Sequence, residues 1–99
     1  DWSSDVCSSD LIQMTRSAAI ELVRDNIRVN ALAPGYVRTA LNAEVLNGPA
    51  GEALLRKIPL GRSAELSELD APLLCLLDPS NTYMTGSVLL VDGGMSAGL

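Results

Sequence analysis

The sequence has no histidine and only two cysteines among its 99 residues. Without an imidazole, histidine-based acid–base catalysis and most zinc sites are excluded, and we predict no metal site. Cys7 lies in a polar leader and Cys75 in an apolar run. Because these contexts are unlike, the sequence predicts no disulfide, and Cys75 is expected to be a small core residue.

Positive charge is also scarce. Seven Lys and Arg residues stand against twelve Asp and Glu, which gives a formal net charge of -5 with no basic patch. A surface of this kind disfavours nucleic acid and anionic membranes as partners.

Long hydrophobic runs are missing as well. Runs such as 72–77 are far shorter than the roughly 18 to 20 residues that cross a bilayer, and no charged-then-apolar leader precedes them. We therefore expect a soluble, cytoplasmic protein with no membrane partner. A chain of 99 residues suffices for one small domain but not for both halves of a dinucleotide-binding enzyme.

The patterning that is present predicts a helix, a strand and a turn in the first third of the chain. Residues 11–24 place apolar side chains on about half of a helix circumference. A face this broad fits a helix covered on two sides or one deep in a larger domain. Residues 27–33 have the β-branched and apolar content of a short buried strand, which Pro34-Gly35 should end as a tight turn.

The rest of the chain predicts a crossover to a second strand. Residues 40–57 are typical of a helical flap broken at Asn47-Gly48-Pro49, and 58–62 form a second turn. Residues 65–77 predict a helix that Pro72 bends or shortens. Residues 87–91 predict a buried strand. This βαβ order indicates an α/β fold with parallel strands. The expected apolar face of the second helix is Leu69, Leu73, Leu76 and Leu77.

A candidate binding segment follows the first strand. Ligands of open parallel sheets bind beyond the carboxyl ends of the strands, where Pro34, Gly35, Val37 and Thr39 are placed. The Pro-Gly pair lets the backbone approach a flat ligand, the amide and carbonyl of Val37 can pair with a carboxamide, and the Thr39 hydroxyl can bond beside it. Taken alone, a Pro-Gly after a strand is more often only a turn.

Four stretches of the sequence together support a binding role for this segment, because their order and spacing match those of a known protein family. They are LIQMTRSAAIEL, IRVNALAPGYVRT, IPLGR and YMTGSVLLVDGG. These stretches resemble the C-terminal third of the short-chain dehydrogenase/reductases. The branch that they resemble contains 3-oxoacyl-carrier-protein reductases and sugar or polyol dehydrogenases. The resemblance covers residues 11–94 and implies an incomplete C-terminal βαβ part of a Rossmann-type doubly wound parallel sheet, in one domain from 11 to 99.

The resemblance also implies a function. Pro34, Gly35, Val37 and Thr39 would line the nicotinamide end of NAD or NADP, and 40–57 would be the substrate flap. Residues 83–94 would form the last strand and a subunit contact of a homotetramer or homodimer. The implied activity is hydride transfer between the nicotinamide and the carbonyl or alcohol carbon of a small molecule.

The first ten residues, DWSSDVCSSD, fit neither pattern. The family helix carries Tyr-x-x-x-Lys, and counting back along it places Ser4 and Ser8 at those positions. The stretch also resembles a translated sequencing-library adapter, so we expect residues 1–10 to be a non-native leader. The open alternative is a polar tail whose Asp10 caps the helix, with Gln13 reaching back.

Two functional hypotheses remain. The first is an oxidoreductase present here as an inactive fragment, with no catalytic residue, glycine-rich motif or Tyr-Lys pair of its own. The second is a non-catalytic binding or scaffold protein that kept the fold and lost the pair by mutation. Other polar residues have simpler roles: Asp92-Gly93-Gly94 as a chain-end turn, Arg38 as a solvated surface residue, and three helix-start surface charges, Glu65, Glu68 and Asp70.

Overall fold

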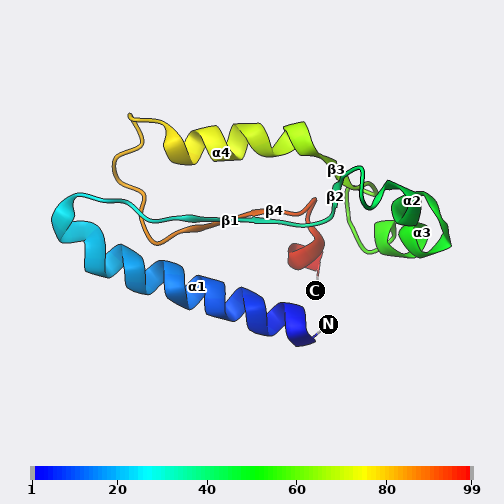
Figure 1. The fold of residues 1–99 in the computed structure, drawn as a ribbon, viewed down its shortest axis with the longest axis horizontal. Helices are drawn as coiled ribbons and strands as arrows, with labels where there is room; N and C mark the ends of the chain where they lie inside the picture. Colours follow the sequence, from blue (N-terminus) through cyan, green and yellow to red (C-terminus); the bar gives the residue numbers. More distant parts are fainter. Residues whose placement is uncertain (1, 99) are drawn as a thin grey trace. The chain divides into compact units, whose positions relative to one another are not determined.

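The computed structural model describes the backbone of residues 2–98 and the side chains of residues 10–97. The chain divides into two compact units, each of which joins segments far apart in the sequence. Unit 1 comprises the chain up to Leu32 together with Leu74–Leu89. Unit 2 comprises Ala33–Leu73 together with the chain from Leu90 onward. Figure 1 shows the course of the ribbon.

Unit 1 begins with helix α1, Trp2–Leu22, which passes into a 3-10 turn at Val23–Asp25. Thr15 and Ala19, four residues apart, form its buried face. The helix starts earlier than the predicted residue 11, and Asp10 lies within it, so the capping alternative is wrong. A formed helix propagates through polar residues more easily than a new one begins. The side chains of Ser4 and Ser8 lie outside the described side chains.

Two strands, β1 (Ala31–Pro34) and β4 (Val88–Val91), pair with each other. The N–H of Ala31 donates to the carbonyl of Ser87 at 2.9 Å in unit 1, and the N–H of Gly35 donates to that of Val91 at 3.0 Å in unit 2. Both strands advance together between these bonds, so they run parallel. The predicted parallel βαβ arrangement is confirmed.

β1 starts four residues later than predicted, because side chains take part in the bonds between residues 29–30 and residues 84–87. The Thr85 hydroxyl accepts from the N–H of Val29 at 3.0 Å. The Asn30 amide donates to the carbonyl of Met84 and accepts from the N–H of Ser87, both at 3.0 Å. The segment before β1 is therefore held by these side-chain bonds together with a backbone bond from the N–H of Gly86 to the carbonyl of Val29 at 2.7 Å.

A charged side chain, that of Arg28, also bonds to the backbone before β4 in unit 1. The Arg28 guanidinium donates to the carbonyls of Met84 and Leu76 at 3.2 and 3.1 Å. Figure 1 shows the beginnings of β1 and β4 in unit 1 between α1 and the end of α4. Arg28 thus ties the end of α4 to the loop that enters β4.

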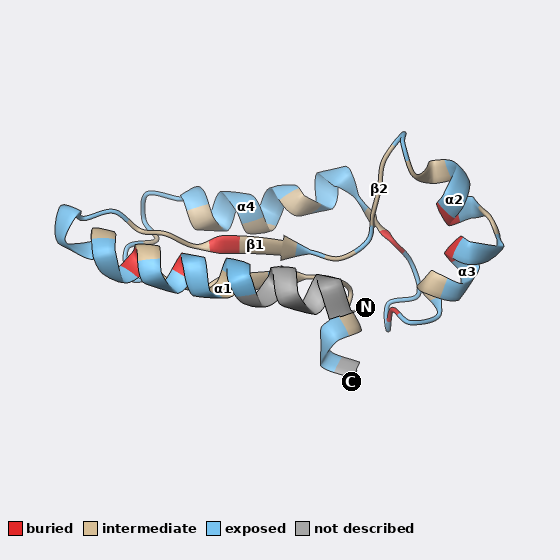
Figure 2. Ribbon diagram, turned by 60° about the horizontal axis from the view of Figure 1, so that its bottom comes forward, coloured by how far each residue is buried: buried red, intermediate tan, exposed pale blue. Residues whose placement is uncertain are grey.

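Unit 2 contains a second parallel pair and the predicted flap. β2, Val37–Arg38, pairs with β3, Ala64–Glu65. Helices α2, Ala43–Asn47, and α3, Pro49–Leu55, meet at Gly48, which confirms the predicted break. Leu46 and Gly51 are the buried residues of these two helices (Figure 2). A Cβ at Gly51 would collide with the backbone of Leu46, so only glycine fits there.

The second predicted helix is split in two. A 3-10 turn, Leu66–Leu69, precedes α4, Asp70–Leu77, and Pro72 falls in the first turn of α4. Proline is tolerated there because a first-turn N–H needs no intrahelical partner.

Within α4 the half-buried residues are Leu69 (at the junction), Pro72 and Leu76. Leu73 and Leu77 are exposed, which corrects the expected face. Cys75 is exposed and free, so its prediction as a core residue is wrong. The half-buried residues follow an i, i+3, i+7 spacing, and Cys75 lies off that face. No helix in the described residues combines the length and apolar character needed to cross a membrane.

Candidate functional site

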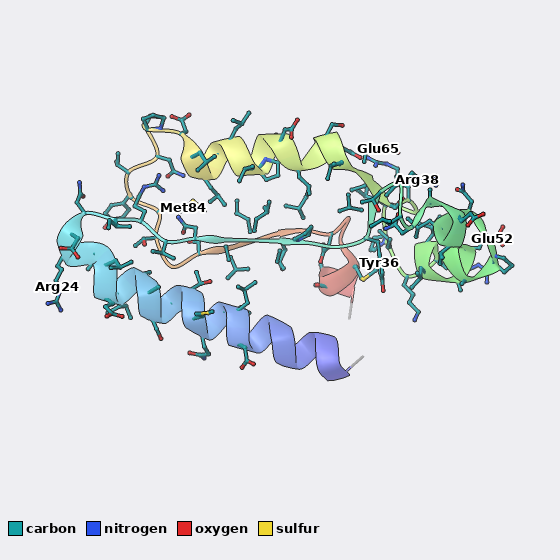
Figure 3. The ribbon with its side chains drawn as sticks, in the orientation of Figure 1. Arg24, Tyr36, Arg38, Glu52, Glu65 and Met84 are labelled. Carbon is teal, nitrogen blue, oxygen red and sulfur yellow. The ribbon has the colours of Figure 1, made fainter. Side chains whose placement is uncertain are left out.

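The four predicted site residues lie together in unit 2, on one segment that leaves the carboxyl end of β1. Pro34 is the last residue of β1, Val37 begins β2, and Thr39 follows β2 directly. The chain passes from β1 to β2 without a turn, so the predicted tight turn at Pro34-Gly35 is wrong. Figure 3 shows Tyr36 and Arg38 from the same segment.

Gly35 is required by a close approach of two backbones. An added Cβ would lie 2.8 Å from the Cβ of Asp92 and 2.9 Å from its Cα. The Gly35 N–H donates to the carbonyl of Val91 at 3.0 Å, which fixes the two chains at this separation. The glycine therefore serves contact with the end of β4.

The pairing of β2 leaves one backbone edge facing away from β3. The N–H of Ala64 donates to the carbonyl of Tyr36 at 2.9 Å, in a register that sets Val37 opposite Ala64. In a parallel ladder, a residue bonds to the two neighbours of its partner. The N–H and carbonyl of Val37 therefore point to the free edge, as a ligand-binding role requires.

Asn42, a residue that the sequence reasoning missed, occupies part of that edge. Its side-chain nitrogen donates to the carbonyl of Val37 at 2.8 Å, and its side-chain oxygen accepts from the N–H of Thr39 at 2.7 Å. The signal in the sequence was an asparagine directly before a helix, a typical capping position. Here the side chain instead joins the two site residues.

The Asp92-Gly93-Gly94 segment is a chain-end turn, as predicted. The Asp92 carboxylate accepts from the N–H groups of Gly94 and Ser96 at 3.0 and 3.1 Å. These bonds stabilise the charged form, and a side-chain hydrogen bond with Ser96 contributes most to lowering the pKa of Asp92. Gly93 and Gly94 have φ values of 64° and 91°, which favour glycine.

The two predicted turns dock onto each other. The N–H of Leu60 donates to the carbonyl of Gly93 at 3.1 Å. The buried side chain of Ile58 packs against Gly93 so closely that a Cβ on Gly93 would lie 2.8 Å from it. A cavity of about 120 Å³ lies beside this contact. Its lining includes Tyr36, Ile58, Arg62, Glu68 and Asp92.

The carboxylates at the start of the second helix, Glu65, Glu68 and Asp70, are exposed surface charges, as predicted, and Glu68 also has partners that the sequence did not predict. Arg62 forms a two-point ion pair with Glu68 at 2.7 and 2.9 Å. Glu68 also accepts from the N–H of Glu65 at 2.9 Å and completes a capping box. The hydrogen bond from Arg62, followed by the bond from the Glu65 backbone, lowers the pKa of Glu68 to about 2.

Arg38 is half-buried and donates to the side-chain oxygen of Asn47 at 2.8 Å, which links β2 to the end of α2. It is therefore less solvated than predicted. Within the described residues, no three His, Cys, Asp or Glu side chains gather as a metal site would require.

Comparison with known proteins places this geometry in a family. A family model described as enoyl-(acyl carrier protein) reductase matches residues 6–96. The chain is 45% identical over 85 residues to a tropinone reductase homologue of Arabidopsis thaliana and 45% over 83 to galactitol 2-dehydrogenase of Cereibacter sphaeroides. It is 42% identical over 85 residues to the 3-oxoacyl-[acyl-carrier-protein] reductase of Thermotoga maritima. These matches cover 85%, 83% and 86% of this chain but 26%, 33% and 34% of the relatives.

Solved structures agree with the sequence matches. A short-chain type dehydrogenase/reductase from Mycobacterium marinum is 38% identical with a TM-score of 0.77, over 89% of this chain and 34% of that one. An NADP complex of RhlG from Pseudomonas aeruginosa is 38% identical with a TM-score of 0.78, over 88% and 34%. A 4-hydroxyisoleucine dehydrogenase with NADH is 29% identical with a TM-score of 0.83, over 92% and 38%.

The chain belongs to the short-chain dehydrogenase/reductase family and corresponds to its C-terminal portion. It spans roughly a quarter to a third of the length of the curated relatives named above. The parallel strands match the C-terminal part of the Rossmann folds of that family.

Proposed function

We propose that residues 11–99 are the C-terminal part of an NAD(P)-dependent oxidoreductase that interconverts a small carbonyl compound and its alcohol. Pro34, Gly35, Val37 and Thr39 form the floor of its nicotinamide site. The observation that carries this proposal is the primary amide of Asn42 bonded to the carbonyl of Val37 and the N–H of Thr39.

That observation tests whether the site fits a nicotinamide. The nicotinamide ring carries a primary carboxamide, the same group as an asparagine side chain. The segment already accepts from one such NH₂ group and donates to one such oxygen, at 2.8 and 2.7 Å. The donor and acceptor set of the segment is therefore suited to a carboxamide.

Each residue has a distinct task in this proposal. NAD(P), when bound, supplies or accepts the hydride. Gly35 lets the segment run against Asp92, Val37 orients the carboxamide through its edge-facing backbone, and Thr39 adds a hydroxyl beside it. The backbone N–H and carbonyl of Thr39 bond to Asn42, and the role of its hydroxyl in this proposal is to bond to the ligand.

We also propose the substrate flap and the subunit contact that the sequence predicts. The broken helices α2 and α3 support a substrate flap over 40–57, because a short two-part element on a glycine hinge can move. Exposed Tyr83 and Leu90 support a subunit contact over 83–94 in a homodimer or homotetramer. The cytoplasmic location stays a prediction from the sequence.

The proposal assigns no hydride-transfer activity to the 99 residues on their own. Reduction of a carbonyl needs a proton donor within about 3 Å of its oxygen, and a serine hydroxyl at position 4 or 8 is too weak an acid near neutral pH. No glycine-rich first turn for the pyrophosphate occurs in the sequence.

The test compares two proteins in one assay. The purified 99-residue chain should turn over no NAD(P)H above a matched blank with carbonyl substrates, whereas the longer protein that carries residues 11–99 should. Turnover by the short chain would contradict the proposal. So would a longer protein that binds neither NADH nor NADPH.

Sequencing the source gene across the codons for residues 1–15 separates the proposal from the scaffold alternative. A Tyr-x-x-x-Lys segment joined in frame to residue 11 supports the enzyme and a non-native leader. An uninterrupted gene that encodes Ser4 and Ser8 supports the scaffold.

A further inference from the structure

The side chain of Asn42 bridges two backbone groups of the proposed nicotinamide segment. The N–H of Thr39 can only donate, so the atom of Asn42 that faces it at 2.7 Å is the oxygen. The amide nitrogen therefore faces the carbonyl of Val37 at 2.8 Å, where it donates. The chemistry of the partners fixes the orientation of this amide.

The bridge occupies the backbone edge that the pairing of β2 leaves open. The pairing with Ala64 turns the carbonyl of Val37 away from β3, toward Asn42. A ligand carboxamide that approaches the same carbonyl along the open edge would place its NH₂ group where the Asn42 amide lies. The residue and the ligand thus present the same chemical group to the same oxygen.

Asn42 also anchors the beginning of the flap. It is the last residue before α2, its carbonyl accepts from the N–H of Leu46 at 2.9 Å, and its N–H donates to the carbonyl of Thr39 at 3.3 Å. Movement of its side chain away from Val37 would remove one of the side-chain bonds that hold the start of the flap to the binding segment, while these backbone bonds remain.

We propose that the side chain of Asn42 competes with the cofactor carboxamide for the carbonyl of Val37. Without cofactor, Asn42 holds the binding segment; when NAD(P) binds, the carboxamide displaces Asn42 from Val37 and this bond at the start of the flap is released. This inference rests on the proposed function. A protein that must first break a contact of its own binds its ligand more weakly than one already open. Loss of the Asn42 amide should therefore strengthen cofactor binding.

Equilibrium binding of NADH and NADPH to the longer protein, followed by cofactor fluorescence, tests this prediction. Asn42→Ala should lower the Kd of the preferred cofactor by about two- to tenfold, the range expected for one hydrogen bond. Asn81→Ala is the matched control, because it removes the same amide from a side chain of unit 1 that donates to the carbonyl of Cys75, outside the proposed site. Its Kd should stay at the wild-type value.

A second variant separates competition from support of the local structure. Asn42→Asp keeps the oxygen that accepts from Thr39 but cannot donate to Val37, so it should also bind cofactor more tightly. Weaker or unchanged binding in both Asn42 variants would overturn the inference and leave the proposed function standing. Failure of the wild-type protein to bind either cofactor would overturn both.

A crystal structure of the wild-type complex gives a readout that does not depend on affinity. The side-chain nitrogen of Asn42 should lie beyond hydrogen-bonding distance of the Val37 carbonyl when cofactor is bound. An Asn42–Val37 bond retained beside the bound carboxamide would show that the carbonyl accepts both groups and would overturn the inference.

Discussion

Gly35 packs closely against Asp92: a Cβ on Gly35 would lie 2.8 Å from the Cβ and 2.9 Å from the Cα of Asp92. The contact joins the end of β1 to the turn after β4, and the N–H of Gly35 closes it by donating to Val91. The proposed nicotinamide segment is thus positioned by the turn at the other end of the sequence.

Gly35→Ala should destabilise the longer protein by about 1 to 3 kcal/mol, because the methyl group forces the two backbones apart. Urea unfolding followed by circular dichroism measures the change. Gly48→Ala is the control, since a Cβ there would meet its nearest neighbour at 3.6 Å, an ordinary contact. Equal stability of the Gly35 variant and the wild type would show that Gly35 and Asp92 are not packed closely enough to exclude a methyl group.

Thr39→Val should weaken cofactor binding or turnover by up to about tenfold, because it keeps the shape of the side chain and removes a hydroxyl whose bond is worth about 0.5 to 1.5 kcal/mol. The Kd of NAD(P)H and the kcat/KM of the substrate report this loss. Thr82→Val, at an exposed position of unit 1, should change neither. Wild-type constants for Thr39→Val would remove Thr39 from the site.

Glu68→Gln should lower stability at neutral pH and abolish one component of its acid dependence. The pKa of Glu68 falls from its ordinary value of 4.5 to about 2 on folding, chiefly through the bond from Arg62. A depressed pKa contributes stability that is full above pH 4.5 and disappears as the pH falls toward 2.

Unfolding of both proteins at a series of pH values measures this component. The difference in unfolding free energy between wild type and Glu68→Gln should shrink through that window, and salt should shrink it at neutral pH, because both side chains are substantially exposed. Glu52→Gln in α3 serves as the control. A difference that stays constant between pH 7 and pH 2 would contradict the assignment.

The 99-residue chain expressed alone should associate or precipitate. Its described side chains leave many large apolar residues exposed, and unpartnered apolar surface of this extent promotes association. Among them are Met14, Ile20, Leu41, Leu74 and Leu90. Light scattering after size exclusion measures the mass, and a soluble monomer with a sharp cooperative melt would contradict this expectation.

The sequence predicted those parts of the fold that local chemistry determines. Gly48-Pro49 breaks the flap helix because proline favours a helix start and suits no helix interior. Glu65, Glu68 and Asp70 are exposed charges at a helix start, as their place in the sequence predicted, although the capping box of the two glutamates was not foreseen. The parallel pairing followed from the order of the elements alone.

The errors arose where contacts between distant residues decide the outcome. Gly35 was interpreted as a turn residue because the nearness of Asp92 is invisible from a dipeptide. β1 starts late because Thr85 bonds to the backbone before it from 56 residues away. Asn42 was missed because a cap residue and a bridging amide look alike until the positions of Val37 and Thr39 are known.

The bond between the Asn30 amide and the N–H of Ser87 spans 57 residues, and this span has a consequence for synthesis on the ribosome. At about 5 to 20 residues per second, roughly 3 to 11 s pass between translation of the two partners. During that interval β1 has left the site of peptide-bond formation while β4 does not yet exist. The flap helices α2 and α3 close through short loops and can form in the meantime. The nascent strand β1 is therefore a segment that a ribosome-associated chaperone would meet before β4 can pair with it.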